Sequence, residues 1–285
     1  MTSGTQVVYQ GEPGAFSEEA VIGFFGEDRE RAAVPTWRAV FEAVDDGSAA
    51  TGVIAIESSL AGTIRETYDL LGEFYDRGIR IVGEVTVPVR LALLALPGQS
   101  LDWIERVYSH AQALVQADAF LRSRDWQVMT TYNTAGAARM IAERRERHAA
   151  AVASPRVADL YGLEILATDI QAGEENRTRF AVLSRSQDTP PAGTDPTAPR
   201  RTTLVFAVRN VPGSLHRCLG AFAGRGVNLS SLESRPARRA RWEYVFWVDV
   251  DAAVDDPACA AALDDLRAET EMVRVLGSYP RARDA

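Results

Sequence analysis

Strand-like and helix-like runs alternate through the first two-thirds of the chain, and this alternation constrains the fold more than any other feature. The strand-like run 51–57 leads into the helix-like run 64–75. Further strand-like and helix-like pairs are 7–11 with 16–25, 103–110 with 112–123, 126–132 with 134–145, and 148–154 with 155–162. The run 80–96 is long enough for two strands or one bent strand. Such alternation is typical of α/β folds with mostly parallel strands. We therefore predict an α/β region of two lobes with a cleft between them.

A proline-rich segment separates this region from a compact C-terminal one. Four of the 13 prolines fall within 190–199, which predicts a linker at 186–201 between domains 1–185 and 202–285. The C-terminal region contains strand-like runs at 203–209, 228–236, 243–251 and 272–280, and helix-like runs at 212–225 and 257–269. This βαββαβ order predicts a ferredoxin-like α+β fold. The basic segment ARRAR (237–241) is typical of a solvated hairpin tip.

Composition excludes several kinds of chemistry. The chain has 285 residues and a formal net charge of −8, which disfavours a nucleic-acid partner. It contains no lysine, so all 31 basic residues are arginines, and a lysine Schiff base or P-loop lysine is excluded. There is no GxGxxG or GxSxG motif. The two cysteines and three histidines lack zinc-site spacing.

No segment of the sequence looks like a membrane span. No apolar run approaches about 18 residues. The N-terminal MTSGTQVVYQ lacks the basic and apolar regions of a signal peptide. We therefore expect a cytoplasmic protein that has no membrane partner.

Small and hydroxylic residues follow the predicted strands, where ligands bind in open α/β sheets. Ser58 and Ser59 follow the run 51–57, and Asn133 and Thr134 follow 126–132. Asn133 also suits a helix N-cap, as do Ser17 and Ser154. The two interpretations are compatible, because helix N-termini bind anions. Several such termini in one cleft would bind a small acid with more than one negative charge.

The stretch NRTRF places Thr178 between Arg177 and Arg179. A guanidinium binds a carboxylate through two parallel hydrogen bonds. If this stretch is a strand, Arg177 and Arg179 share one face and Thr178 lies on the other. Periodicity alone leaves open which face meets the cleft.

These motifs resemble those of the prephenate dehydratase family. NRTRF contains the family's TRF motif, and the other similar stretches occur in the family's order: YQGEPGAFSE, IESSLAGTIRETYDLL, SHAQALVQADAFL, YNTAGAARMIA and AVASPRVADLYGLEILATDIQ. The segment 211–236 resembles an ACT domain through its GAL-like and ESR motifs. The resemblance covers essentially the whole chain apart from the predicted linker.

The resemblance implies a two-lobed catalytic domain like a periplasmic binding protein, followed by an ACT regulatory domain. It implies conversion of prephenate to phenylpyruvate, with loss of water and carbon dioxide, in phenylalanine biosynthesis. L-phenylalanine would be an allosteric effector bound at ACT domain interfaces. No metal and no organic cofactor are implied. The ACT resemblance also implies a homo-oligomer, with a tetramer ahead of a dimer.

The resemblance also assigns residues. Thr178 would be the catalytic residue that assists the leaving hydroxyl, since a hydroxyl in a dry cleft can donate to an oxygen as it becomes negative. The substrate-binding set would be Ser58, Ser59, Gln112, Asn133, Thr134, Arg179 and Phe180. The phenylalanine-binding set would be Gly213, Ser214, Leu215, Asn228, Leu229, Glu233, Ser234 and Arg235.

Some positions depart from the family pattern and leave alternatives open. Ala55 and Ser58 replace the proline and asparagine of the usual PIENS, Ala15 replaces a threonine, Ala111 replaces a proline, and Asn133 stands where serine is common. The change to Ser58 shortens a side chain expected to touch substrate. The alternatives are an arogenate dehydratase, a paralogue that decarboxylates prephenate without aromatising it, and a non-catalytic amino-acid sensor.

Overall fold

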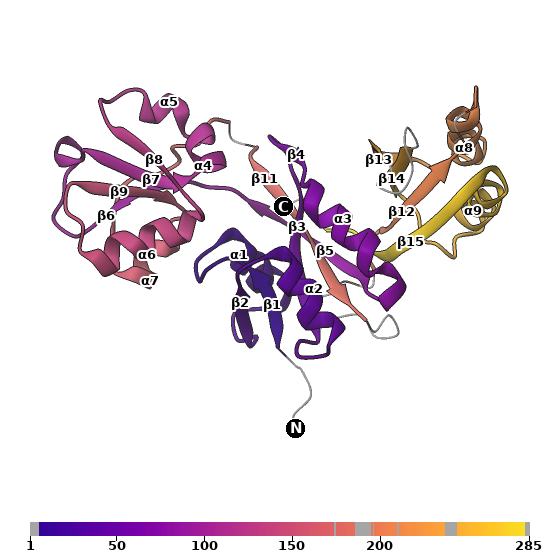
Figure 1. Ribbon diagram of the computed structural model, residues 1–285, viewed down its shortest axis with the longest axis horizontal. Helices are drawn as coiled ribbons and strands as arrows, with labels where there is room; N and C mark the ends of the chain where they lie inside the picture. Colours follow the sequence, from indigo (N-terminus) through magenta and orange to yellow (C-terminus); the bar gives the residue numbers. More distant parts are fainter. Residues whose placement is uncertain are drawn as a thin grey trace. The chain divides into compact units, whose positions relative to one another are not determined.

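A computed structural model describes residues 6–173, 175–185, 195, 197–209, 211–236 and 244–282. The chain divides into two compact units (Figure 1): Met1–Thr67 with Thr86–Phe180, and Tyr68–Val85 with Ala181–Ala285. Residues 68–85 thus group with the C-terminal region, although they precede the predicted linker. The ARRAR segment and most of the predicted linker lie outside the described residues.

The first lobe of the first unit is built on parallel strands. β1 (Val7–Gln10) pairs in parallel with β2 (Arg31–Val34) and β3 (Thr51–Ser58). The strand order of this sheet is β2-β1-β3-β11-β5, with the short β4 (Gly62–Thr63) beside β3. The helices α1 (Phe16–Phe25) and α2 (Trp37–Asp45) connect these strands. The arrangement brings the carboxyl ends of β1 and β3 to one edge, where the predicted polar residues begin.

The second lobe of the first unit contains a sheet of order β10-β6-β9-β7-β8. Its strands are β6 (Ala92–Ala95), β7 (Arg106–His110), β8 (Gln127–Thr131), β9 (Ala149–Ala153) and β10 (Glu164–Ala167). β7 pairs in parallel with β8 and β9, whereas β6 pairs in antiparallel with β9 and β10. The prediction of mostly parallel strands therefore holds for only part of this lobe.

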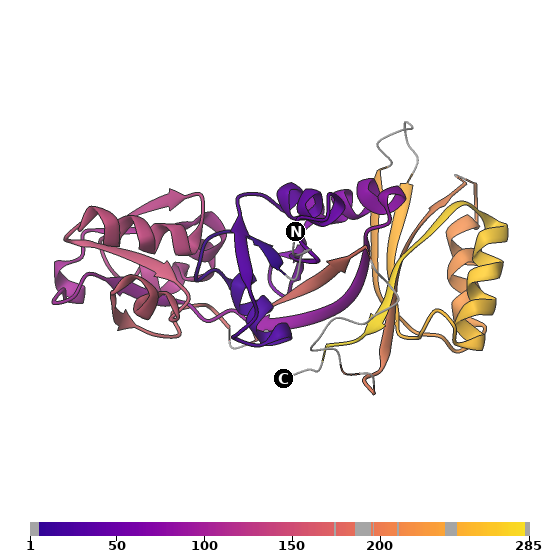
Figure 2. The same cartoon turned by 90° about the horizontal axis from the view of Figure 1, so that it is seen from below.

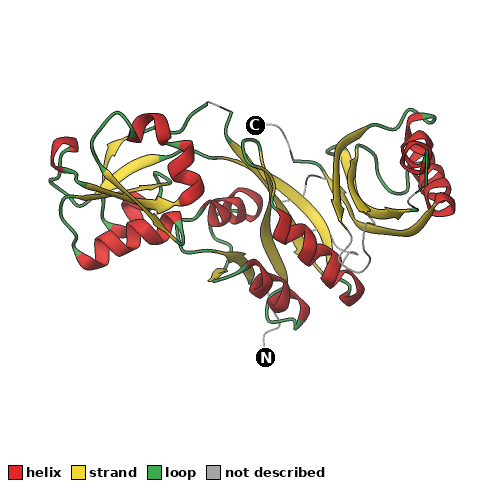
Figure 3. Cartoon of the chain, turned by 45° about the horizontal axis from the view of Figure 1, so that its top comes forward, coloured by secondary structure: helices red, strands yellow, loops and turns green. Residues whose placement is uncertain are grey.

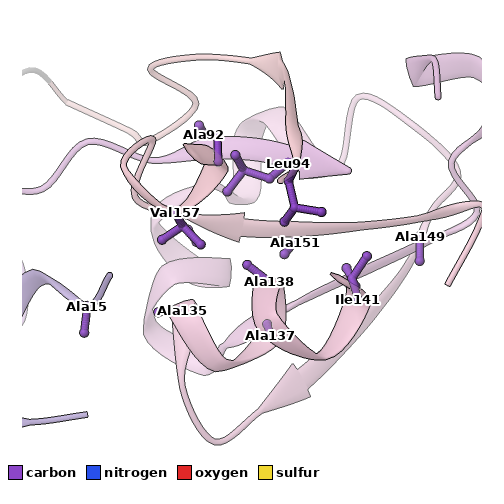
Figure 4. Packing of buried hydrophobic residues seen from close by; sticks show 13 residues of the cluster. Ala15, Ala92, Leu94, Ala135, Ala137, Ala138, Ile141, Ala149, Ala151 and Val157 are labelled. Carbon is purple, nitrogen blue, oxygen red and sulfur yellow. The ribbon is translucent and has the colours of Figure 1, made fainter. Parts of the chain in front are cut away.

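Helices cover both faces of the second sheet (Figure 3). They are α4 (Ala111–Gln116), α5 (Asp118–Leu121), α6 (Thr134–Arg144) and α7 (Val157–Tyr161). Side chains alternate along β9: Ala151 packs with α6, and Val152 packs with α4 and α5. Figure 4 shows the α6 side, where Ala138 and Ile141 face the alanines of β9. Small side chains on both elements allow close helix–sheet packing.

The structure corrects some local predictions and decides others. The helix-like run 112–123 is broken at Ala117 into α4 and α5. Of the two alternatives for 80–96, the structure has two strands, β5 (Arg80–Pro88) and β6. Asn133 caps α6 by accepting from the N–H of Gly136 at 3.0 Å, as predicted. Ser17 lies inside α1, whose N-cap is Ala15, and the N-cap of α7 is Arg156 rather than Ser154.

The second unit contains the predicted βαββαβ order. Figure 2 shows its two helices, in orange and yellow, side by side on one face of the sheet. Its elements are β12 (Arg200–Val208), α8 (Ser214–Ala223), β13 (Leu229–Pro236), β14 (Tyr244–Val250), α9 (Pro257–Glu269) and β15 (Thr270–Pro280). The sheet order is β13-β14-β12-β15, and all three pairings are antiparallel. α8 and α9 pack on Phe206, Phe246 and Val248 of one face. This confirms the ferredoxin-like prediction.

The other face of that sheet is covered by residues 68–85 of the same unit. This segment contains the end of α3 (Arg65–Phe74), a short 3-10 helix at Tyr75–Arg77, and most of β5. Tyr68 packs edge-on against Trp247, with ring centroids 5.0 Å apart. A Cβ added at Gly277 would lie 2.1 Å from the carbonyl oxygen of Ile81, so glycine is required for this close approach. Residues 68–85 therefore bury part of the sheet face that lies opposite α8 and α9.

Candidate active site

The first unit contains a cavity of about 270 Å³ at the ends of its strands. Both lobes contribute residues, because β1, β3 and β11 (Arg177–Ser184) come from the first lobe and α4 and α6 from the second. The size is close to the lower limit for small-molecule sites, roughly 300 Å³. The predicted residues that line it are Ser58, Gln112, Asn133, Thr134, Thr178 and Phe180.

β11 presents alternate side chains to this cavity. Thr178 and Phe180 line it, and Phe180 is only 1 % exposed. The Arg179 guanidinium instead pairs with the Glu57 carboxylate at 2.9 Å, and Arg179 is not among the lining residues within the described part of the chain. The face of β11 that meets the cavity is therefore the one that carries Thr178. Within the described residues, the Thr178 hydroxyl makes no hydrogen bond to the protein and can meet a ligand.

Ser58 and Ser59 have different surroundings. Ser58 is 3 % exposed and lines the cavity, and its hydroxyl accepts weak hydrogen bonds from the N–H groups of Leu60 and Ala61 at 3.4 and 3.3 Å. The Ser59 hydroxyl donates to the carbonyl of Glu175 at 2.9 Å and accepts from the N–H of Arg177 at 3.0 Å. Ser59 thus ties β3 to the segment that leads into β11, and it is not a lining residue.

Three helices of at least nine residues begin at the cavity. α1 begins at Phe16, α2 at Trp37 and α6 at Thr134, and all three residues line it. The first N–H groups of a helix lack intrahelical partners, and the N-terminus carries roughly half a positive charge. No Asp, Glu or Arg lines the cavity in the described part of the chain. The positive potential for an anion therefore comes mainly from backbone dipoles.

A hydrogen-bonded cluster lies at the rim of the cavity. Tyr132 lines the cavity although it is 69 % exposed. Its hydroxyl donates to Glu12 at 3.1 Å, and Glu12 also pairs with Arg139 of α6 at 2.8 Å. Arg139 donates to the Tyr132 oxygen at 3.3 Å. Burial, followed by the hydrogen bond to Glu12, raises the pKa of Tyr132, so the phenol stays protonated and keeps its donor.

Sequence reasoning missed several lining residues, most clearly Trp37. β2 and α2 were not predicted, although Thr36 accepts a capping hydrogen bond from Ala39 at 3.1 Å and Val40, Phe41 and Val44 are buried at helical spacing. This cap and this spacing were the available signal. The other missed lining residues are Gln10, Ala15, Phe16, Ser17, Ala55, Ile64, Val89, His110, Ala113, Gln116 and Tyr132.

A separate cavity of about 320 Å³ lies in the second unit, at the start of α8. Gly213, Ser214 and Leu215 of the predicted phenylalanine-binding set line it, together with Arg209 and Tyr244. The N-cap of α8 is Gly213, at a φ of 81°, so the helix begins at Ser214 and not at residue 212, where the predicted run begins.

The rest of the predicted phenylalanine-binding set lies elsewhere in the second unit. Asn228 precedes β13, and its amide donates to Asp251 at 2.8 Å. Arg235 pairs with Asp69 at 3.6 Å. Leu229, Glu233, Ser234 and Arg235 all belong to β13, an outer strand of the sheet, and do not line this cavity within the described residues.

The described residues contain no helix that is long and apolar enough to cross a membrane. They also contain no cluster of three or more His, Cys, Asp or Glu side chains that could hold a metal ion.

Two family models match the chain: prephenate dehydratase over residues 7–188 and ACT domain over residues 202–268. A bifunctional chorismate mutase/prephenate dehydratase of Aquifex aeolicus is 35 % identical over 279 residues, which are 97 % of this chain and 74 % of that protein. Arogenate dehydratase 1 of Petunia hybrida is 40 % identical over 291 residues, which are 96 % of this chain and 66 % of that protein.

Solved structures share the whole fold. The prephenate dehydratase of Arthrobacter aurescens in complex with L-Phe has a TM-score of 0.85 and 31 % identity, and the match covers 97 % of this chain and 90 % of that one. A protein described as GqqA, a novel type of quorum quenching acylase, has the same TM-score and 35 % identity, and the match covers 97 % and 98 % of the two chains.

Proposed function

We propose that this chain, which belongs to the prephenate dehydratase family, converts prephenate to phenylpyruvate, water and carbon dioxide as a step of phenylalanine biosynthesis. The observation that carries the proposal is the cavity of the first unit. It combines Thr178 and Phe180 on one face of β11 with the starts of α1, α2 and α6. Such a site offers a hydroxyl donor, an aromatic contact and several backbone dipoles to one small acid.

The helix starts suit a substrate with two carboxylates. Prephenate is a dianion, and the cavity offers backbone N–H groups at the positive ends of three helices. Asn133 and Thr134 at the start of α6 and Gln112 in α4 add side-chain donors. We predicted Arg179 as a carboxylate partner, but its ion pair with Glu57 supports a different role, in which it stabilises β11 beside β3. We propose that backbone groups take the carboxylates.

Thr178 is proposed to assist the leaving hydroxyl. The C–O bond of the ring breaks, the ring carboxylate leaves as carbon dioxide, and its bonding electrons complete the aromatic ring. The departing hydroxide takes up a proton from the Thr178 hydroxyl and becomes water, and Thr178 is reprotonated from the solvent. A positioned donor stabilises that oxygen as its negative charge develops. Because aromatisation drives the reaction, the protein mainly orients the substrate and assists this one bond.

The test of the proposed function is incubation of the purified chain with prephenate, followed by identification of the product. Phenylpyruvate is the expected product. A non-aromatic keto acid would indicate a decarboxylase, and binding without turnover would indicate a sensor. Comparing kcat/KM for prephenate and arogenate tests the remaining alternative. Ala15, Ala55 and Ser58, which depart from the family pattern, all line the cavity and make this comparison informative.

An acylase activity is a second candidate, because GqqA is 35 % identical to this chain over 97 % of its length. Hydrolysis of an N-acyl substrate requires a nucleophile and a base in one site. Ser58, Thr178 and His110 line the same cavity and are the residues to test for those roles. Release of a free carboxylic acid from an N-acyl substrate would support this activity. Turnover of prephenate with no release of acid from N-acyl substrates would reject it.

We further propose that L-phenylalanine regulates the enzyme by binding at the start of α8. The support is the ACT family match, the L-Phe complex of the Arthrobacter aurescens protein, and the cavity lined by Gly213, Ser214 and Leu215. β13 is an outer strand, so Asn228 and the ESR residues would reach a site at a boundary with a second copy. We propose a cytoplasmic homo-oligomer, a tetramer before a dimer.

The Gly213→Ala variant should bind L-phenylalanine at least about tenfold more weakly than the wild type. An added Cβ would be strained at a φ of +81° and would lie 3.1 Å from the Arg217 guanidinium, which disturbs the start of α8. Gly226→Ala is the matched control, because Gly226 has a φ of +68° with nothing within 4 Å of the added Cβ and does not line the cavity. Calorimetric titration measures both variants. No binding of phenylalanine to the wild type would contradict the regulatory proposal.

A further inference from the structure

Glu12 lies in the turn between β1 and α1 of the first lobe, but its side-chain partners belong to the second lobe. One carboxylate oxygen accepts from the Tyr132 hydroxyl at 3.1 Å, and the other pairs with Arg139 at 2.8 Å. The Glu12 side chain is only 19 % exposed. A half-buried carboxylate with two donors contributes more than a solvated surface pair. These three residues, Glu12, Tyr132 and Arg139, form the rim clasp.

The rim clasp fixes Tyr132 against the start of α6. A Cβ added at Gly136 would lie 2.7 Å from the Tyr132 hydroxyl oxygen and 2.8 Å from its ring, so the phenol rests directly on the first turn. Asn133 and Thr134, which line the cavity, occupy that same turn. Tyr132 also lines the cavity while being 69 % exposed, which places its ring at the mouth.

The rim clasp is one of several contacts between the lobes. Two others involve residues that do not line the cavity. Tyr161 donates to the carbonyl of Pro13 at 2.9 Å, and Arg156 pairs with Glu27 at 2.6 Å. Glu27 and Arg156 are 58 % and 39 % exposed, and neither lines the cavity. The rim clasp alone among these contacts includes a cavity-lining side chain within the described residues. It therefore links lobe closure to the shape of the site.

We propose that Glu12 is a positioning residue for the reaction of the first-unit cavity: from one lobe it holds Tyr132 of the other over the mouth, so that the ring covers the bound dianion at the start of α6. This inference rests on the proposed function for the identity of the substrate. When the charge of Glu12 is removed, its hydrogen bond to Tyr132 and its pairing with Arg139 weaken, so Tyr132 leaves the mouth for part of the time. The apparent affinity then falls in proportion to the fraction of molecules in which the mouth is closed. Chemistry in the closed complex is unchanged.

Kinetics of Glu12→Gln, Tyr132→Phe and the double variant test this proposal. Each single variant should raise KM about tenfold and change kcat less than about twofold, since a hydrogen bond to a charged group contributes roughly 10–100-fold in equilibrium. The double variant should be no worse than Tyr132→Phe, because Glu12 acts through Tyr132. Measurements at roughly 0.5 M salt, where screening lengths are a few ångströms, remove the effect of changing the charge near a dianion.

Glu27→Gln is the matched control, because it breaks an ion pair between the same lobes away from the mouth. It should leave KM unchanged. A Glu27→Gln effect equal to that of Glu12→Gln would overturn the proposal in favour of general lobe association. Multiplicative KM effects in the double variant, or a fall in kcat with KM unchanged, would also overturn it.

A measurement made without substrate tests the positioning role of Glu12 independently of the proposed dehydratase function. Amide hydrogen exchange at residues 134–136 should become faster in Glu12→Gln and stay unchanged in Glu27→Gln. If the wild type does not turn over prephenate, the proposed function fails, but the exchange result still decides whether Glu12 positions Tyr132. Unchanged exchange in Glu12→Gln would overturn the positioning role whatever the substrate.

Discussion

The Thr178→Ala variant should lower kcat by about 10²–10⁴-fold, the usual scale for a positioned proton donor. The hydroxyl faces the cavity and has no hydrogen bond to the protein within the described residues. Its removal therefore deprives the substrate of a hydrogen-bond donor but breaks no hydrogen bond of the folded protein. Steady-state kinetics with prephenate measure the loss, and an unchanged melting temperature shows that folding is intact.

Two matched substitutions separate the hydroxyl from the shape of Thr178. Thr178→Val keeps the branched Cβ that suits a strand, but it should be as inactive as Thr178→Ala. Thr178→Ser keeps a hydroxyl and should retain most of the turnover. Near-wild-type turnover in Thr178→Ala would reject Thr178 as the donor. If Thr178→Val were active and Thr178→Ser inactive, the role of Thr178 would be packing and not hydrogen-bond donation.

The Arg201→Met variant should be destabilised by about 3–5 kcal/mol, the usual cost of leaving one member of a buried ion pair behind. One Arg201 nitrogen donates to both oxygens of Glu84, at 3.0 and 2.8 Å. The two side chains are only 8 % and 1 % exposed. Glu84 belongs to β5 and Arg201 to β12, so the pair fastens residues 68–85 to the ferredoxin-like sheet within the second unit.

Denaturant unfolding measures this loss as a lower midpoint. Adding Glu84→Gln to Arg201→Met should restore much of the stability, since the buried carboxylate charge that has lost Arg201 is then removed as well. Arg217→Met is the control, because Arg217 pairs with Glu269 in the same unit at 49 % and 42 % exposure and should cost under about 1 kcal/mol. Equal losses from Arg201→Met and Arg217→Met would show that burial of the Glu84 pair contributes nothing.

Local signals explain which elements could be predicted. α1 spans Phe16–Phe25 and α9 spans Pro257–Glu269, as their sequence patterns predicted. For α9 the signal was strong, because Asp256 caps the helix and Pro257 opens it. The run 112–123 gave no sign of its break, because Ala117 and its neighbours are all compatible with a continuous helix. That break depends on packing against the sheet.

The sequence by itself determined the α/β and βαββαβ element orders, the family, and the hydroxyl and amide residues that follow the strands, because each of these depends on residue type and spacing along the chain. Only the tertiary structure decided which face of β11 meets the cavity. Strand periodicity puts Thr178 and Arg179 on opposite faces of β11 but does not say which residue faces the cavity. In the structure, Arg179 pairs with Glu57 on β3, and Thr178 lines the cavity. The rim clasp also required the fold, because Glu12 and Arg139 are 127 positions apart and meet only when the two lobes pack.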